Sequence, residues 1–205
     1  MADGEGGRSC KSVVDEIKAY RPFYDSSGGG ITVSGGEPLC QASAVAELFR
    51  LCKKEGIHTV IDTSGAVKLT HSVKTVLQYS NLVILDVKHI RSAAHHAITG
   101  MGNEKTLAFA RYLEEVGIPF WVRYVVVPGY SDAEEDAVLL ADFLAPFTSL
   151  EQVYLLPYHS LGEHKWKSMG VTSPLHGVAP PSQDCMGRLK ECMISRGISS
   201  VSCKT

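Results

Sequence analysis

The sequence predicts a parallel α/β protein, on the basis of two observations. Five apolar segments that suit β-strands alternate with segments whose apolar residues recur at helical spacing. The strand segments are apolar almost throughout, as is typical of strands covered by helices on both faces. The pattern is compatible with an open doubly wound sheet or with a barrel, and we predict one domain over residues 1–205.

The amino-acid composition excludes some kinds of binding partner. The chain has 205 residues, 44% of them hydrophobic, and a net charge of -2, which suits one globular domain with a sizeable core. Its 20 Lys and Arg residues nearly balance its 22 Asp and Glu residues, so we expect no nucleic-acid partner, and no apolar run is long enough to cross a membrane. Residues 1–7 lack the features of a signal or transit peptide.

The predicted elements begin with a helix after a lead at residues 1–9. Ser12-Val13-Val14-Asp15 resembles a capping box, and Arg21-Pro22 ends this helix. A loop at 26–30 then leads into a strand at 31–34.

Helices and strands then alternate to the end of the chain. We expect further helices at 42–55, 70–79, 103–117, 132–145 and 182–196, and further strands at 57–62, 82–88, 120–127, 153–156 and in the tail.

A Gly-Gly turn follows the first strand. Gly35-Gly36 lets the backbone approach another group closely, Glu37 adds a carboxylate and Pro38 stiffens the exit. Two interpretations stay open at this stage, a ligand-contacting turn and an ordinary tight turn.

Polar side chains lie within or just beyond the C-terminal ends of five strands. These residues are Glu37, Asp62, Asp86 with Lys88, Arg123 and His159. In parallel α/β folds these strand ends line the active site, so we predict one polar pocket.

Each of these residues also has a structural interpretation. Asp62 could cap the turn that follows it, and Lys88 could form a structural ion pair with Asp86. His159 could be a hydrogen-bonded core histidine. Arg123 is harder to explain in this way, because a charge in an apolar strand needs a partner.

Several motifs of this sequence resemble those of a known enzyme family. Ser34-Gly35-Gly36-Glu37-Pro38 looks like the motif of radical S-adenosylmethionine (SAM) enzymes. Longer segments resemble, in the same order, the pyruvate formate-lyase-activating enzyme family: 27–37, 52–59, 85–88, 121–129, 155–159, 161–166 and 177–181.

The resemblance implies a partial (β/α)6 barrel, of which this chain would lack the first β/α unit. It implies reductive cleavage of SAM at a [4Fe-4S] cluster, giving a 5′-deoxyadenosyl radical that abstracts hydrogen from a glycine of pyruvate formate-lyase. An electron donor such as flavodoxin or ferredoxin would be a second partner, in a reducing compartment, either the cytoplasm or an organelle matrix. Neither a nucleic acid nor a membrane is expected to take part.

The resemblance also implies roles for individual residues. Gly35 and Gly36 would lie along the methionine part of SAM, with Glu37 as a nearby negative partner. Asp86-Val87-Lys88 would contact SAM, with Lys88 facing its carboxylate, and His159 would bond to the nucleoside part.

Two further roles follow from the same resemblance. Arg123 would be the catalytic residue that orients SAM or the incoming glycine loop. Asp62, Thr63 and Asp86 would be candidates for holding a monovalent cation.

The chain departs from the family in its cysteines. The six cysteines are Cys10, Cys40, Cys52, Cys185, Cys192 and Cys203, and no CxxxCxxC or CxxC occurs. We therefore expect no [4Fe-4S] ligands in this chain, because one isolated cysteine cannot replace three thiolates.

Several alternatives remain open. One is that the chain is an N-terminally truncated fragment, and another is that it is a short form that binds SAM or the lyase without catalysis. An activase of a different glycyl-radical enzyme would share the mechanism. A Schiff-base aldolase with Lys88 as the nucleophile belongs to a different class.

Overall fold

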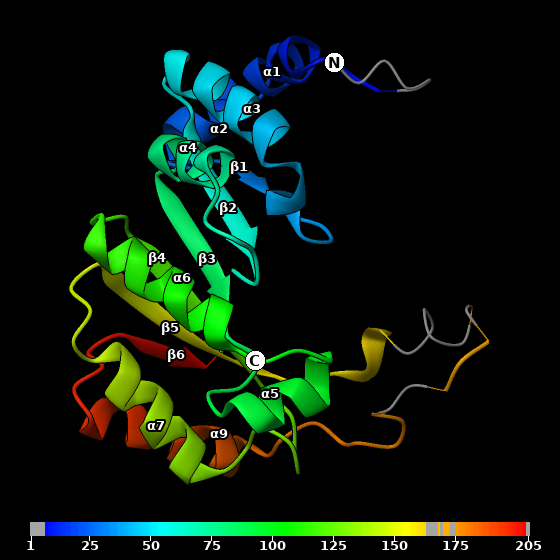
Figure 1. Ribbon diagram of the computed structural model, residues 1–205, viewed down its shortest axis with the longest axis vertical. Helices are drawn as coiled ribbons and strands as arrows, with labels where there is room; N and C mark the ends of the chain where they lie inside the picture. The colour runs from blue at the N-terminus through cyan, green and yellow to red at the C-terminus, as the bar shows by residue number, and fades with distance from the viewer. Residues whose placement is uncertain (1–6, 163–167, 169, 173–174, 204–205) are drawn as a thin grey trace. The chain divides into compact units, whose positions relative to one another are not determined.

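Strands and helices alternate along the chain in the computed structural model, which describes residues 7–162, 168, 170–172 and 175–203 (Figure 1). The strands are β1 (Gly30–Val33), β2 (His58–Thr63), β3 (Leu82–Asp86), β4 (Phe120–Val126), β5 (Leu150–Pro157) and β6 (Val201–Cys203). The helices are α1 (Cys10–Lys18), α2 (Arg21–Ser27), η1 (Pro38–Gln41), α3 (Ala42–Lys54), α4 (His71–Tyr79), α5 (Ser92–Thr99), α6 (Glu104–Glu115), α7 (Glu134–Leu144), η2 (Ser160–Gly162) and α9 (Gln183–Ser195).

The strand order in the sheet is that of the chain, β1-β2-β3-β4-β5-β6. The pairs β1–β2, β2–β3 and β5–β6 are parallel, with Gly30 opposite His58 and Val60 opposite Leu82. The predicted parallel α/β class is therefore confirmed.

The chain divides into two compact units. Unit 1 comprises Met1–Leu85 and Lys105–Phe120, and unit 2 comprises Asp86–Glu104 and Trp121–Thr205. The single-domain organisation predicted above stays a prediction.

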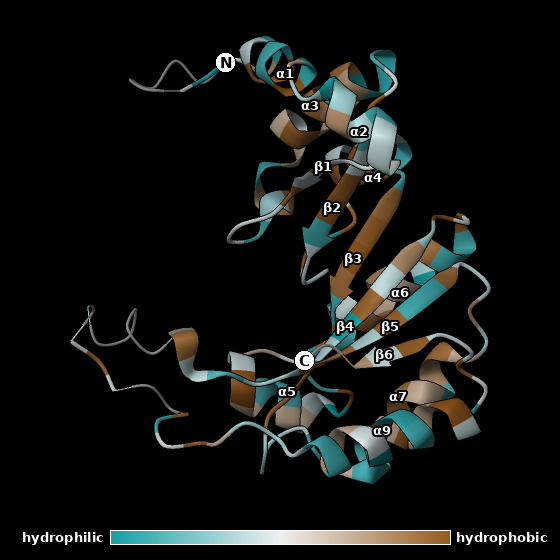
Figure 2. Cartoon of the chain, turned by 180° about the vertical axis from the view of Figure 1, so that it is seen from behind, coloured by the Kyte–Doolittle hydropathy of each residue, from teal (hydrophilic) through white to brown (hydrophobic). Residues whose placement is uncertain are grey.

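The core of unit 1 is built on β2 and the helices beside it. Side chains of β2 alternate between buried and half-buried, and Ile61 is fully buried with Phe49 of α3. Two threonines take the other buried positions, and the Thr59 hydroxyl is satisfied by the Tyr79 carbonyl at 2.6 Å. Figure 2 shows β2 as mainly hydrophobic with a hydrophilic end, which is where the candidate site residues lie.

The core of unit 2 follows the same alternation. In β4, Val122 and Val126 are fully buried, whereas Arg123 between them is half-buried. Buried leucines of α7 and α9 complete this core. Arg123 is thus the charged side chain of an otherwise apolar strand, at a position that is not fully buried.

The predicted start and end of the first helix were wrong. Ser9, not Ser12, caps α1, because the Ser9 hydroxyl accepts the Ser12 amide at 3.1 Å. α1 ends at Lys18, before Arg21-Pro22, and Pro22 lies in the first turn of a new helix, α2, where its missing N–H costs no hydrogen bond. Gly28, at φ 66°, then ends α2.

The segment after β3 also differs from the prediction. The strand ends at Asp86 rather than at 88, and α5 occupies residues for which no helix was predicted. The helix predicted at 103–117 is present as α6, which begins directly after Asn103, and the side-chain amide of Asn103 donates to the carbonyls of His89 and Ile90 at 3.1 and 2.5 Å.

Gly30 permits the pairing of the first two strands. A Cβ at this position would lie 2.0 Å from the backbone oxygen of His58, on the neighbouring strand. No L side chain fits in that space, so the approach of β1 to β2 depends on glycine.

The buried thiol of Cys52 makes the unfolding free energy depend on pH. It is fully buried beside Val14 and Ile57, and this burial raises the pKa of its thiol to about 11, from an ordinary 9.0. The contribution of the thiol to stability is complete below pH 9 and is lost as the pH rises toward 11, because only the unfolded thiol ionises readily there. We expect urea denaturation to show a smaller fall in unfolding free energy over this range for Cys52→Ala than for wild type; identical slopes would contradict the assignment.

None of the helices in the described part of the chain is long and apolar enough to cross a membrane.

Candidate functional site

The Gly-Gly turn of unit 1 has a backbone shape that requires glycine. Gly35 has φ 93° and Gly36 has φ 55°, both in the left-handed region that L side chains rarely adopt. A Cβ at either position would meet no protein atom within 4 Å. The turn therefore exposes its backbone groups to open space, as a ligand-contacting turn must.

Glu37 joins this turn to the end of β2. Its Oε1 accepts hydrogen bonds from the Leu39 amide at 3.1 Å and from the Thr63 hydroxyl at 2.7 Å. Its Oε2 accepts from the Ser64 amide at 2.9 Å and from the Ser64 hydroxyl at 2.6 Å. We call Ser34, Glu37, Asp62, Thr63 and Ser64 the turn cluster.

Other contacts hold the turn cluster in place. The Ser34 hydroxyl donates to Asp62 Oδ2 at 3.1 Å, and the buried Thr106 hydroxyl donates to the Ser64 carbonyl at 2.9 Å. A Cβ on Gly65, the next residue, would lie 2.8 Å from Leu85 Cδ1. The loop after β2 is therefore closely packed on one side and bonded to the turn on the other.

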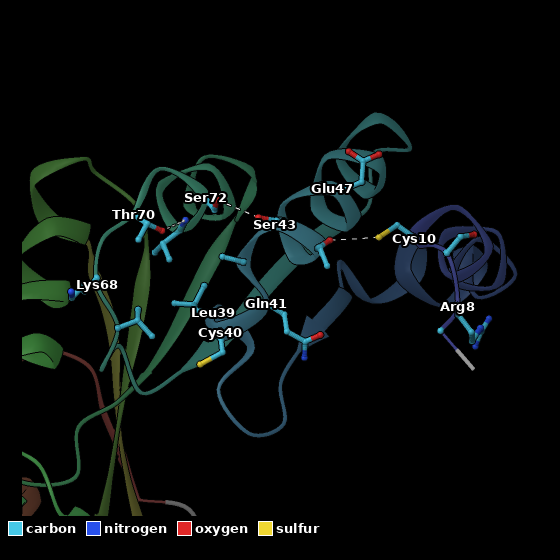
Figure 3. A pocket seen from close by; sticks show the side chains of 16 residues that line it. Arg8, Cys10, Leu39, Cys40, Gln41, Ser43, Glu47, Lys68, Thr70 and Ser72 are labelled. Atoms are coloured by element: carbon cyan, nitrogen blue, oxygen red, sulfur yellow. Dashed lines mark hydrogen bonds between the residues drawn. The ribbon is translucent and has the colours of Figure 1, made fainter. Parts of the chain in front are cut away.

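The turn borders a hollow part of unit 1. Ser34 and Gly35 line a cavity of about 220 Å³. A larger one, of about 970 Å³, lies over the beginnings of α1, α3 and α4, and both are lined by Arg8 and Gln41. Figure 3 shows the Ser43 and Ser72 hydroxyls of the larger cavity pointing toward each other. A space of this size is within the range of small-molecule sites.

In unit 2 a carboxylate lies between two cations at the end of β3. Asp86 accepts from Lys88 Nζ at 3.0 Å through Oδ2 and from Arg123 Nε at 2.8 Å through Oδ1. Their side chains are 20%, 37% and 28% exposed respectively, so water reaches all three. Arg123 thus has the partner that its place in an apolar strand required, and the structural ion pair considered for Lys88 is present. We call these residues the strand-end cluster.

A buried pair lies directly after this cluster. His89 is 1% exposed, and its Nε2 lies 3.2 Å from Asp136 Oδ2, on α7. Its Nδ1 accepts the Arg91 amide at 3.0 Å, which fixes the tautomer with the proton on Nε2. Arg91 also bonds to Asp136. The backbone that carries Lys88 is therefore anchored from its next residue.

Two other predicted residues have different surroundings. His159 is exposed, so it is not a core histidine, and the preceding residue, Tyr158, donates its amide to the Val126 carbonyl at 3.0 Å. The Val87 side chain is fully buried, and its amide donates to the Arg123 carbonyl at 3.0 Å. Residues 163–166 of the predicted 161–166 segment lie outside the described residues.

The structure brings together Glu37, Asp62 and Thr63 in unit 1, and Asp86, Lys88 and Arg123 in unit 2. The sequence interpretation missed Ser64 and His89. Ser64 belongs to a Thr-Ser-Gly turn at a strand end, a signal that could have been used, whereas the partner of His89 is 47 positions away and has no local signal.

The family resemblance implies two cofactors, SAM and a [4Fe-4S] cluster, and the described residues suit the first better than the second. The open Gly35-Gly36 turn of unit 1 leaves room for a ligand, and Lys88 of unit 2, taken by itself, offers a cationic group to a charged one. Among residues 7–162, 168, 170–172 and 175–203, no three His, Cys, Asp or Glu side chains gather as a metal site. Burial also raises the pKa of the thiols of Cys185, Cys192 and Cys203, which disfavours the thiolate that a cluster needs. These residues do not fit a [4Fe-4S] cluster.

Comparisons with known proteins agree with the motifs. The sequence profile of the radical SAM superfamily matches residues 4–141. The chain is 44% identical over 191 residues to the pyruvate formate-lyase 1-activating enzyme of Escherichia coli (strain K12), covering 92% of this chain and 78% of that protein. It is 42% identical over 179 residues to the pyruvate formate-lyase-activating enzyme of Staphylococcus epidermidis, covering 85% and 71%.

A solved structure extends the similarity to the fold. A domain of the pyruvate-formate lyase-activating enzyme from Bacteroides vulgatus superposes with a TM-score of 0.71 at 26% identity, covering 86% of this chain and 99% of that one. The profile match, the identity and the shared fold lead to one conclusion. The chain belongs to the radical SAM superfamily and, within it, to the family of pyruvate formate-lyase-activating enzymes.

Proposed function

We propose that this protein takes part in glycyl-radical activation, with SAM as its small-molecule ligand and pyruvate formate-lyase as its protein substrate. The observation that carries the proposal is the open, left-handed Gly35-Gly36 turn beside a cavity, in a chain 44% identical to an activating enzyme. SAM, when bound and reduced by one electron, would release methionine and supply the 5′-deoxyadenosyl radical that takes a hydrogen atom from a glycine.

In this proposal each residue binds or orients. The backbone of Gly35 and Gly36 contacts the methionine part of SAM, because no side chain stands between it and a ligand. Lys88 complements the SAM carboxylate as a point charge, and Asp86 keeps its ammonium in place. His159, which is exposed, bonds to the nucleoside part.

Arg123 and the oxygen-rich turn cluster have supporting roles. Arg123 is the catalytic residue in this proposal, orienting SAM or the glycine loop of the partner, while Asp86 fixes its Nε. Asp62 and Thr63 offer hard oxygen atoms of the kind that a monovalent cation prefers. The electron would come from a donor protein such as flavodoxin or ferredoxin.

Single substitutions test the ligand assignment. Lys88→Ala and His159→Ala are each expected to weaken SAM binding by about 10- to 100-fold, because each removes a hydrogen bond to a charged or polar ligand group. Isothermal titration calorimetry on the 205-residue chain measures this. The matched controls are Lys105→Ala and His71→Ala, both at exposed positions, which should leave the affinity unchanged. Unchanged affinity in Lys88→Ala and His159→Ala would count against the assignment.

A separate experiment tests the chemical step. We expect the 205-residue chain, reconstituted with iron and sulfide, to give no stable [4Fe-4S] absorption spectrum, because its described residues do not supply the thiolate set. A stable spectrum together with SAM cleavage would overturn this expectation. SAM binding without cleavage would favour a binding role over catalysis.

A further inference from the structure

We propose that Glu37 is a positioning residue, which fixes the Gly35-Gly36 turn onto the end of β2 and does not itself contact the ligand. The inference deepens the proposed function, since the ligand of this turn is SAM there. It differs from the role that the family resemblance implies, in which Glu37 is a nearby negative partner of SAM.

The acceptor capacity of the Glu37 carboxylate is already used within the protein. An ionised carboxylate has two oxygen atoms with about four lone-pair sites. Each oxygen of Glu37 already receives two donors, at distances between 2.6 and 3.1 Å. A ligand ammonium group would have to displace one of these four donors, and a displaced amide or hydroxyl in this half-buried place would lose its partner.

The four donors to the Glu37 carboxylate come from two separate segments of the chain. One is the Leu39 amide, in the first turn of η1, on the same side of the turn as Glu37 itself. The other three belong to Thr63, the last residue of β2, and to Ser64, which follows it. The carboxylate therefore connects two backbone segments that are 26 to 27 residues apart in sequence.

The glycines of the Gly35-Gly36 turn make few contacts that would hold the turn in one conformation. Both glycines are exposed, and no protein atom lies within 4 Å of either Cβ position. Glycine has the largest backbone freedom to lose, so an unsupported Gly-Gly pair would sample many conformations. The support comes from its two neighbours, because Ser34 bonds to Asp62 before the turn and Glu37 bonds to Ser64 after it.

Thr63 and Ser64, to which Glu37 bonds, are themselves held in place by other hydrogen bonds. Thr63 is 2% exposed, and its hydroxyl also accepts the Gly65 amide at 2.9 Å. The Ser64 carbonyl accepts the buried Thr106 hydroxyl. A turn fixed to Thr63 and Ser64 holds its backbone groups in one arrangement before the ligand binds. Binding then costs less conformational entropy.

Hydrogen exchange on the 205-residue chain without ligand tests the positioning role directly. In Glu37→Gln the amide –NH2 replaces one acceptor oxygen and opposes donors, so exchange of the Leu39 and Ser64 amides should accelerate about tenfold or more. Amides of α3 such as those of Phe49 and Cys52 should keep their protection. The control Glu115→Gln, at an exposed position on α6, should change neither. Unchanged exchange at Leu39 and Ser64, or an equal loss over the whole chain, would overturn the proposal.

Ligand titrations then separate positioning from direct contact. The probes are SAM and its analogue without the amino group, and the variants are Glu37→Gln, Ser64→Ala and the double variant. If Glu37 positions the turn, Ser64→Ala alone weakens SAM binding, the double variant is no weaker than Glu37→Gln, and Glu37→Gln still distinguishes SAM from the analogue.

Direct contact predicts a different set of results. Ser64→Ala would then leave the affinity unchanged, and Glu37→Gln would bind SAM and the analogue equally, which would overturn the positioning role. If the wild-type chain binds no SAM, the proposed function fails, while the hydrogen-exchange result still decides the role of Glu37.

Discussion

Gly30→Ala is expected to lower the unfolding free energy by more than about 3 kcal/mol, among the largest effects that a single substitution has. The new Cβ would lie 2.0 Å from the backbone oxygen of His58, 2.7 Å from its carbonyl carbon and 2.8 Å from its Cβ. The nearest obstacle is backbone in a neighbouring strand, so no side-chain rotation relieves the clash. The β1–β2 pairing must separate, and urea denaturation followed by circular dichroism measures the loss.

The same substitution at Gly187 is the matched control. Gly187 lies inside α9, and a Cβ there would meet no atom within 4 Å. Alanine is favoured over glycine inside a helix by roughly 1 kcal/mol, so Gly187→Ala should be stabilising. If both variants shifted stability in the same direction, the clash at Gly30 would not be the cause.

Asp86→Asn is expected to weaken SAM binding by at least about tenfold, because it removes the charge that Lys88 and Arg123 share. Without it the two cations repel each other and neither keeps its position. The unfolding free energy should fall by about 1 to 2 kcal/mol, a modest loss because water reaches all three side chains. Calorimetric titration with SAM and urea denaturation measure the two effects.

An exposed ion pair provides the comparison for this prediction. Asp142 lies 3.4 Å from Arg196, and both side chains are 49% exposed. Asp142→Asn should therefore change stability by less than about 1 kcal/mol and leave SAM binding unchanged. A loss of SAM affinity in Asp142→Asn equal to that in Asp86→Asn would show that the effect comes from net charge and not from the strand-end cluster.

The succession of strands and helices could be predicted because it depends on local patterns. The apolar run of β3 and the helical spacing of α3 are visible in any short window. The helix α2 was missed because Pro22 normally ends a helix, and only its place in the first turn allows one to begin. The helix α5, with two histidines and two alanines at its centre, has only a weak periodic signal.

The candidate site could be predicted as a set of positions but not as a set of bonds. Strand ends in a parallel α/β fold identify Glu37, Asp86 and Arg123 as members. The partners of Glu37 could not be deduced, because the distance between Glu37 and Ser64 depends on how β1 and β2 are staggered. Ion pairing of Arg123 was foreseen from the cost of an unpaired charge, whereas its partner depended on the register of β3 and β4.

The division of the chain into two units has a consequence for how the protein can be taken apart. The chain passes from one unit to the other at three places, after Leu85, after Glu104 and after Phe120. Two of these crossings fall within or at the start of strands, in β3 and β4. No single cleavage or truncation can therefore release either unit as a continuous polypeptide.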